Sequence, residues 1–245
     1  MIVETFTVPK EFCGPSQTAH GGYVCGRLAN HLEGPATVRL KTGAPLGVEL
    51  RIEASDGEAR LFEQDGLIAE ARCTDFDLRP PSAPSFATAA EASKAFVAMD
   101  RHPFARCFVC GPQRAPGDGM RIFPGAVHGQ SLIAAPWVPN AAFAQGSEYV
   151  RPEFMWAVLE CTGGFAWYPQ MVVLGELSGQ IKSAIRPGDK CVVVGWRIGA
   201  EGRKHFAGTA VFSEAGDTVA VGRATWIEIP KDAFVGLSRT GRRTP

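Results

Sequence analysis

The stretch AHGGYVCGRLA (residues 19–29) places a histidine and two glycines at the start of an apolar segment of helical length. A second apolar segment of helical length, RPEFMWAVLECTGGFAW, spans residues 151–167. Each segment is followed by four stretches with the length and alternation of β-strands. A long apolar helix among antiparallel strands predicts a sheet wrapped around its helix, and the repetition predicts an internal duplication.

The strand-like stretches follow the two helices in the same order. They span 36–42, 48–55, 57–64 and 67–76 in the first half, then 172–185, 190–202, 204–216 and 217–229 in the second, with further strands predicted at 119–125 and 131–138. The pattern of LIAEARCT (67–74) matches that of TVAVGRATW (218–226), so that Arg72 falls on Arg223. A single sheet of this kind has an exposed edge with unpaired backbone N–H and C=O groups. Joining two sheets edge to edge pairs many of these groups.

A segment of different composition separates the two halves. It begins Pro-rich and becomes Ala-rich, which predicts a linker followed by a short helix near 88–99 with Thr88 as its cap. The predicted organisation is a first domain at 1–78, the linker at 79–103, a second domain at 104–230 and a disordered basic tail at 231–245.

Charge and composition exclude several classes of protein. The 245 residues carry 25 basic and 25 acidic side chains, so there is no electrostatic reason to expect a nucleic-acid or anionic-membrane partner. No stretch approaches the roughly 18 apolar residues of a membrane span, and the N-terminus lacks the pattern of a signal peptide. An odd number of cysteines, seven in all, indicates reduced thiols. We therefore expect a cytoplasmic protein.

Three motifs resemble the hotdog-fold thioesterase superfamily. His20-Gly21-Gly22 looks like the H-G-G signature of phenylacetate-pathway-type thioesterases and their relatives. CFVCG (107–111) with GMRIF (119–123) is similar to the C-F-x-C-G…G-L-x-x-F motif of many bacterial hotdog proteins, and WAVLEC (156–161) is similar to their acid-bearing helix. The resemblance implies an α+β double hotdog, in which two antiparallel sheets, each wrapped around a central helix, join into one pseudo-dimeric sheet.

The resemblance also implies where the site lies. In single-domain relatives, an Asp or Glu follows the His of H-G-G by nine residues. Counting nine from His20 reaches Ala29, and counting nine back from Glu160 reaches Arg151, so each helix keeps one half of the pattern. Because hotdog sites lie between two units, one composite site is expected, with His20 and its glycines facing Glu160. Arg151 and Ala29 would then mark the abandoned site.

The implied activity is that of an acyl-CoA thioesterase. A helix N-terminus presents unpaired N–H groups, so Gly21 and Gly22 suit the oxyanion that forms when a thioester carbonyl is attacked. Glu160, in apolar surroundings, is expected to act as general base or nucleophile. His20 and Ser178 are the expected orienting groups.

The expected substrate is an acyl-CoA, so coenzyme A enters as part of the substrate and no separate cofactor is expected. Gln17 is a candidate contact for the acyl carbonyl. Trp156 is a candidate wall of an acyl tunnel, although aromatic residues at such positions are more often core. The CoA phosphates have several candidate basic partners, among which the sequence does not choose: Arg121, Arg151, Lys182 and Arg186. Duplicated hotdog proteins often associate further, which suggests a homo-oligomer.

Two other functions stay open. A hotdog enoyl-CoA hydratase or dehydratase could use His20 with Glu160, although the wider hydratase signature is absent. A non-catalytic acyl-CoA-binding protein would also show the loss of half a site from each helix. In that case His20 would be a packing or capping histidine, Glu160 would pair with an arginine or point outward, and the glycines would relieve crowding.

His102, Cys107 and Cys110 form H-x4-C-x2-C, a spacing found in zinc sites. Structural zinc sites usually need four ligands, and no second pair with suitable spacing follows. His128 or Cys161 could contribute only if the fold brought them near. A tight turn without a metal is therefore the prediction for this stretch.

Overall fold

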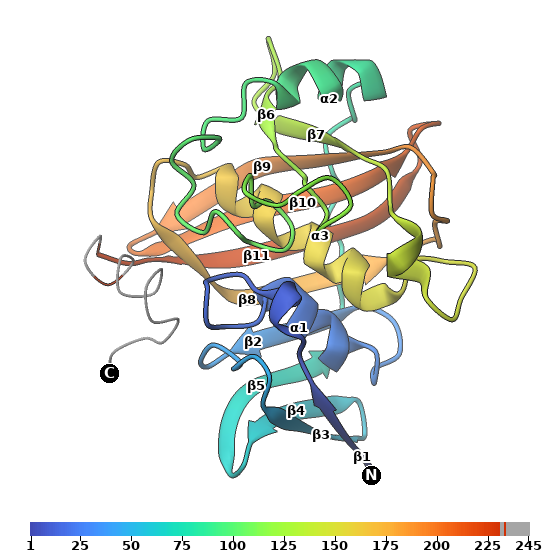
Figure 1. The fold of residues 1–245 in the computed structure, drawn as a ribbon, viewed down its shortest axis with the longest axis vertical. Coiled ribbons are helices and arrows are strands. Elements are labelled where there is room, and N and C mark those ends of the chain that lie inside the picture. The colour runs from blue at the N-terminus through green and yellow to red at the C-terminus, as the bar shows by residue number, and fades with distance from the viewer. Residues whose placement is uncertain (231–232, 234–245) are drawn as a thin grey trace.

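The structure, a computed structural model, describes residues 1–230 and 233. One antiparallel sheet of 11 strands runs through it in the order β1-β3-β4-β5-β2-β8-β11-β10-β9-β7-β6 (Figure 1). The strands are β1 (Ile2–Thr7), β2 (Ala36–Leu40), β3 (Glu49–Ser55), β4 (Glu58–Glu63), β5 (Gly66–Cys73), β6 (Gly125–Ala126), β7 (Ile133–Trp137), β8 (Val172–Ile181), β9 (Cys191–Glu201), β10 (Lys204–Ser213) and β11 (Thr218–Glu228).

Among the described residues, three α-helices accompany the sheet. α1 (Gly21–Ala29) and α3 (Pro152–Phe165) pack against each other and against strands at the middle of the sheet. α2 (Phe86–Ser93) packs near one edge, against β6, β7 and β9 (Figure 1). Two short 3-10 helices are η1 (Lys10–Phe12) and η2 (Ala141–Ala144). Within residues 1–230 and 233, no helix combines the length and the apolar character that crossing a membrane requires.

The pairing order of the strands repeats along the sheet. β1-β3-β4-β5-β2 in one half corresponds to β7-β9-β10-β11-β8 in the other, and β2 pairs with β8 where the halves meet. Thr37 lies opposite Ser178 across this junction. Thr37 also pairs with Arg72 on β5, and Ser178 pairs with Arg223 on β11. Arg72 and Arg223 therefore occupy equivalent positions, as the sequence match predicted.

The helix starts are equivalent as well. The N–H of Ala19 donates to the carbonyl of Ala44, and the N–H of Val150 donates to the carbonyl of Ile185. The next residue in each case is the N-cap of a central helix, His20 for α1 and Arg151 for α3. The count of nine residues therefore starts from equivalent positions, His20 and Arg151, in the two helices. Ala29 on α1 is then equivalent to Glu160 on α3.

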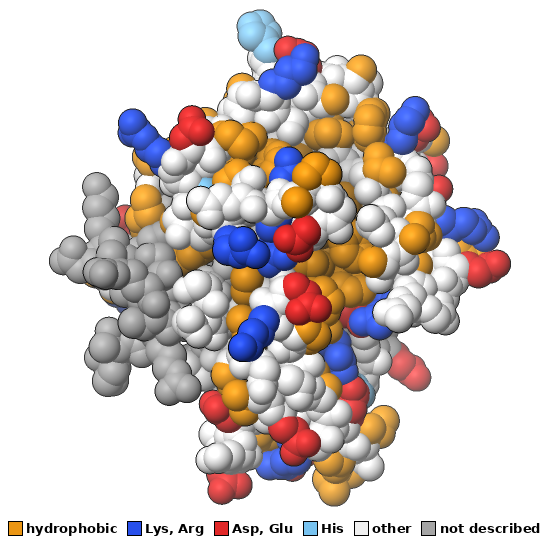
Figure 2. Space-filling view, in the orientation of Figure 1, with side chains coloured by type: hydrophobic (Ala, Val, Ile, Leu, Met, Phe, Trp, Pro, Cys, Tyr) orange, Lys and Arg blue, Asp and Glu red, His pale blue; other side chains and the backbone are white. Residues whose placement is uncertain are grey.

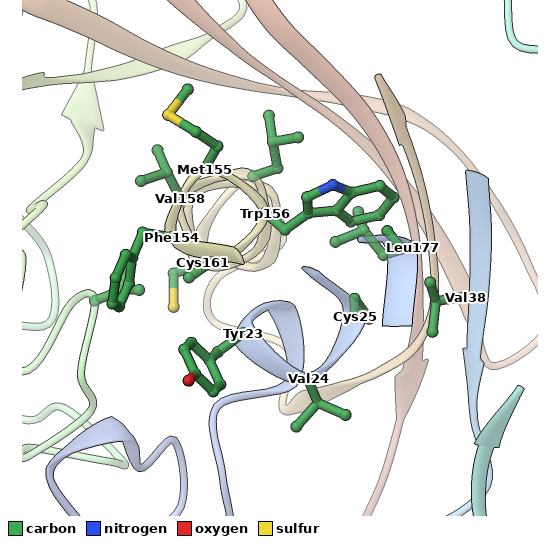
Figure 3. Packing of buried hydrophobic residues seen from close by; sticks show 14 of the residues in the cluster. Tyr23, Val24, Cys25, Val38, Phe154, Met155, Trp156, Val158, Cys161 and Leu177 are labelled. Carbon is green, nitrogen blue, oxygen red and sulfur yellow. The ribbon is translucent and has the colours of Figure 1, made fainter. Parts of the chain in front are cut away.

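Side chains on the two faces of the sheet belong to separate hydrophobic clusters. The larger cluster fills the space between the sheet and the helices α1 and α3, where Trp156 reaches from α3 toward Leu177 on β8 (Figure 3). In the second half, alternation sends Val193 to this side and Val192 and Val194 to the other. α2 and the chain before it cover that second side.

The outer surface shows no broad area of one charge on the face drawn in Figure 2, outside the part covered by grey atoms. Acidic and basic side chains are interspersed there among hydrophobic ones (Figure 2). This agrees with the balanced composition.

Two local predictions were wrong. The predicted strand at 119–125 is absent. Only its last residue, Gly125, lies in a strand, the short β6 that Gly125 forms with Ala126. Arg121 has a φ of 54°, and the N–H groups of Met120 and Ile122 donate instead to the carbonyls of the CFVCG turn. The short helix begins at Phe86, and its N-cap is not Thr88.

The cap of α2 is Ser85, whose side chain accepts the N–H of Thr88. Serine is a favoured N-cap because its oxygen satisfies one of the unpaired amides of the first turn.

The division into domains at 1–78, 79–103 and 104–230 stays a prediction. The predicted disordered tail, 231–245, lies outside the described residues except for position 233.

Candidate active site

Glu160 on α3 reaches the N-terminus of α1. Its Oε2 accepts the backbone N–H of Gly22 at 2.5 Å and lies 2.9 Å from Nδ1 of His20. Gly22 is the second residue of α1, whose first amides have no partner within the helix. The carboxylate therefore sits where the helix presents free donors and a partial positive charge.

His20 is fixed on both sides of its ring. Its side chain is 1% exposed, and its Nε2 lies 3.1 Å from the Sγ of Cys161. Figure 3 shows the sulfur of Cys161 pointing from α3 toward α1. Tyr23 N–H also approaches Nδ1, at 3.4 Å. The contact of Nδ1 with the Glu160 carboxylate is shorter than its contact with Tyr23. Because a carboxylate can only accept hydrogen bonds, Nδ1 carries a proton and donates it to Glu160.

The charges around His20 oppose the effect of burial. Burial alone would lower the pKa of His20, but the negative charges of Glu160 and Cys107 outweigh it and raise that pKa to about 10. Burial would likewise raise the pKa of Cys107. Hydrogen bonds from the thiols of Cys110 and Cys161, with the charge of His20, lower it well below its usual value. The negative charges near His20 thus favour the protonated form of its ring.

Glycine at the start of α1 makes this proximity possible. A Cβ on Gly22 would lie 2.7 Å from the carbonyl oxygen of Trp156 and 3.0 Å from the Cα of Ala157. A Cβ on Gly21 would meet side chains only, among them Oε1 of Glu160 at 3.3 Å. Gly22 thus serves close helix packing, and its amide is already engaged by Glu160.

A cavity of about 170 Å³ opens beside this group. Its wall contains His20, Gly21 and Glu160 together with apolar side chains such as Leu40, Phe165 and Leu174. Among the described residues that line it, Glu160 is the one acidic side chain and none is Lys or Arg. The cavity thus offers one acid and a helix N-terminus in mainly apolar surroundings.

Comparison with known proteins bears on the fold. No model of a protein family and no curated protein sequence matches the chain. Among solved structures, it is similar to a hot dog fold protein of unknown function from Alicyclobacillus acidocaldarius, with a TM-score of 0.52 and 8% identity over 93% of each chain. This chain has a hotdog fold.

Two further solved structures have higher TM-scores. A candidate thioesterase from Novosphingobium aromaticivorans has a TM-score of 0.60 and 11% identity, over 93% of this chain and 96% of that one. The dehydratase domain of a mycocerosic acid synthase-like PKS has a TM-score of 0.62 and 13% identity, over 93% of this chain and 90% of that one. At such low identity, these similarities establish the fold alone.

Ser178 is not brought to the site of this hotdog chain. Its hydroxyl lies 2.8 Å from that of Thr37. A Cβ on the next residue, Gly179, would contact Trp156 and Leu159 on the helix side of the sheet. Because neighbouring strand residues point to opposite faces, Ser178 points away from Glu160.

Changing Ser178 to alanine is therefore expected to leave any activity that depends on Glu160 within about twofold of the unchanged protein, because the hydroxyl lies on the far face of the sheet. Steady-state kinetics on the purified variant measures this. A large loss of kcat without a loss of thermal stability would show that Ser178 reaches the site after all.

The three residues predicted to bind substrate also lie outside the cavity wall. Gln17 is exposed on the loop before α1. Trp156 is 4% exposed and packs in the core between α3 and the sheet. Arg151 forms an ion pair with Glu153 at 2.5 Å. None of the three lines the cavity.

The position equivalent to the site is filled differently in the other half. Ala29 stands where Glu160 stands on α3, and Glu153 stands where Gly22 stands on α1. Glu153 accepts from Asn30 at 3.2 Å as well as from Arg151. An ion pair thus occupies the position in this half that corresponds to the contact between Glu160 and Gly22 in the other, and that Arg151 and Ala29 mark an abandoned site stays a prediction.

Sequence reasoning missed the group that borders His20. Cys107, Cys110, Cys161 and His102 all line the same cavity. The sequence analysis named His102, Cys107 and Cys110, and it allowed Cys161, 54 residues beyond Cys107, only if the fold brought it near. It did not connect any of these residues with His20.

Proposed function

We propose that this hotdog chain is an acyl-CoA thioesterase with one composite site, built as a double hotdog from two repeats. The observation that carries the proposal is the contact of Glu160, on the helix of the second repeat, with the helix start of the first. An acid held at free backbone donors beside an apolar cavity suits attack on a thioester carbonyl. The candidate thioesterase from Novosphingobium aromaticivorans, which has the same fold, adds support.

The proposed reaction uses the two oxygens of Glu160 differently. Oε2 is held by Gly22 N–H and His20, which leaves Oε1 to take a proton from water. That water attacks the carbonyl carbon, and the developing oxyanion is stabilised by the Gly21 amide at the helix start. Breaking the C–S bond then releases the carboxylic acid, and the proton that Glu160 took from water passes to the CoA thiolate, so that free CoA leaves and Glu160 is ionised again. Direct attack by Glu160 is the alternative route to the same products.

The contacts of His20 favour hydrolysis over hydration. A hydratase that used His20 as its acid or base would need one ring nitrogen to face the substrate. Both nitrogens are engaged here, Nδ1 with Glu160 and Nε2 with Cys161. His20 therefore acts as a positioning residue for Glu160.

The cavity indicates the kind of acyl group. Its volume of about 170 Å³ is similar to that of apolar cavities of about 150 Å³ that hold a benzene ring. A short aliphatic or single-ring acyl group fits such a volume. The cavity wall has no described Lys or Arg, so the CoA phosphates would contact residues outside it.

Hydrolysis of a panel of acyl-CoAs tests the proposal. We expect release of free thiol from acetyl-, benzoyl- and octanoyl-CoA, with the first two turned over more efficiently than the third. Loss of enoyl absorbance from crotonyl-CoA without thiol release would support a hydratase instead. Calorimetric binding of acyl-CoA without either reaction would support a non-catalytic binding protein.

A further inference from the structure

Three possible ligand atoms for a metal converge beside the start of α1, from parts of the chain that are distant in sequence. The ligand atoms of His20, Cys107 and Cys161 all lie within 4.8 Å of one another, and all three residues are buried. Cys110, three residues after Cys107 in the same turn, is buried as well and lines the same cavity as these three residues. We propose that His20, Cys107, Cys110 and Cys161 form a tetrahedral zinc site.

The spacing of the sulfurs fits this metal. Two sulfurs that are each about 2.3 Å from a tetrahedral zinc ion lie about 3.8 Å apart. The Sγ atoms of Cys107 and Cys161 are 3.7 Å apart. Three thiolates and one imidazole form a donor set that is typical of structural zinc sites.

The second nitrogen of His20 supports its role as a ligand. Histidines that bind metals almost always donate their other ring N–H to a carboxylate, a carbonyl or water. Nδ1 of His20 makes this contact with Glu160 at 2.9 Å, which leaves Nε2 for the metal. The zinc site would therefore fix the ring that positions Glu160.

His102 supports the site from outside. Its Nδ1 accepts the N–H of Phe104 at 2.9 Å, so Nε2 carries the proton in the neutral ring. That Nε2 lies 3.2 Å from the Sγ of Cys110 and can donate to it. This tautomer makes Cys110 the fourth ligand and His102 its hydrogen-bond donor.

The turn that carries Cys107 and Cys110 is held rigidly. The N–H of Gly111 donates to the carbonyl of Cys107, and a Cβ on Gly111 would lie 2.5 Å from that oxygen. Arg114, 4% exposed, donates to the carbonyls of Arg106 and Cys107. Such a preorganised turn lowers the cost of ordering both thiolates around an ion.

Zinc would join three separate segments: the start of α1, the turn at 107–111 and the middle of α3. Binding needs all three sulfurs as thiolates and Nε2 of His20 without a proton, so every proton that these four atoms still hold is released to solvent when the ion binds. The site goes beyond the proposed hydrolysis, because it stabilises the junction of the two halves. It also replaces the sequence-based expectation of a plain turn.

Metal analysis of the purified full-length chain tests the proposal. We expect one zinc per chain by plasma mass spectrometry and less than a tenth of that in Cys107→Ser and Cys161→Ser. Cys191→Ser is the matched control, because Cys191 is equally buried but lies on β9 away from the cluster, and it should retain the metal. Cobalt substitution should give the charge-transfer absorbance of a thiolate site.

A second measurement uses the unchanged sequence, so that it does not depend on the folding of variants. Protein stripped with a chelator should gain about 5–10 °C in Tm when zinc is added at a hundred times its Kd. No metal after reconstitution, with no change in Tm, would overturn the proposal. So would an intact mass that shows the loss of two hydrogens in a Cys107–Cys161 disulfide. Each readout is independent of thioester hydrolysis.

Discussion

Changing Glu160 to glutamine is expected to lower kcat for acyl-CoA hydrolysis by about 10²–10⁴-fold, the usual contribution of a general base. Glutamine keeps the shape of the side chain, and its carbonyl oxygen can still accept the Gly22 N–H. It cannot take a proton from water. The loss should therefore appear in kcat, with KM little changed, in steady-state assays of free-thiol release.

Glu153→Gln is the matched control for this variant. Glu153 is a buried acid on the same helix, 5% exposed, but it does not line the cavity. Its turnover should stay within a few-fold of the unchanged protein, provided that thermal denaturation shows both variants folded. A folded Glu160→Gln protein with normal kcat would remove Glu160 from the mechanism, whatever the substrate.

The topology could be predicted because it follows from periodicity that is repeated. Alternation marks strands, a long apolar run marks each central helix, and the order of both recurs in the two halves. The prediction that Arg72 and Arg223 occupy equivalent positions was confirmed, because the register of a strand fixes which residue lies opposite each of its residues. The pairing of His20 with Glu160 was expected from the resemblance, since neither helix carries both groups.

Other features depended on contacts that the sequence does not encode locally. Cys161 joins Cys107 only because α3 packs against the turn, so spacing rules for zinc ligands could not find it. Residues 119–125 were predicted to form a strand, but the amides of Met120 and Ile122 donate to carbonyls of the CFVCG turn. The prediction that Ser178 belongs to the site could have been avoided. Leu177 faces the helices, and because strand residues alternate, Ser178 must point to the other face.

α1 and α3 also pack tightly one turn beyond the site, at Gly26. A Cβ there would lie 2.5 Å from the Cα of Glu153 and 2.8 Å from the Cβ of Trp156. The first of these atoms is backbone and the second is fixed in the core, so neither can move without displacing α3. With Gly22 one turn earlier, Gly26 allows the two helices to pack nearly backbone to backbone.

Changing Gly26 to alanine should therefore lower the free energy of unfolding by about 3 kcal/mol, at the upper end of typical overpacking costs. The gain of about 1 kcal/mol in helix propensity offsets only part of the strain. For a chain of this size, the loss corresponds to a fall in Tm of about 6–12 °C. Gly199→Ala is the control, because no heavy atom lies within 4 Å of its added Cβ, and its Tm should hardly change. Equal Tm values for the two variants, measured by calorimetry, would mean that the helices can separate at no cost, and the contact between Glu160 and the start of α1 would then not be fixed by their packing.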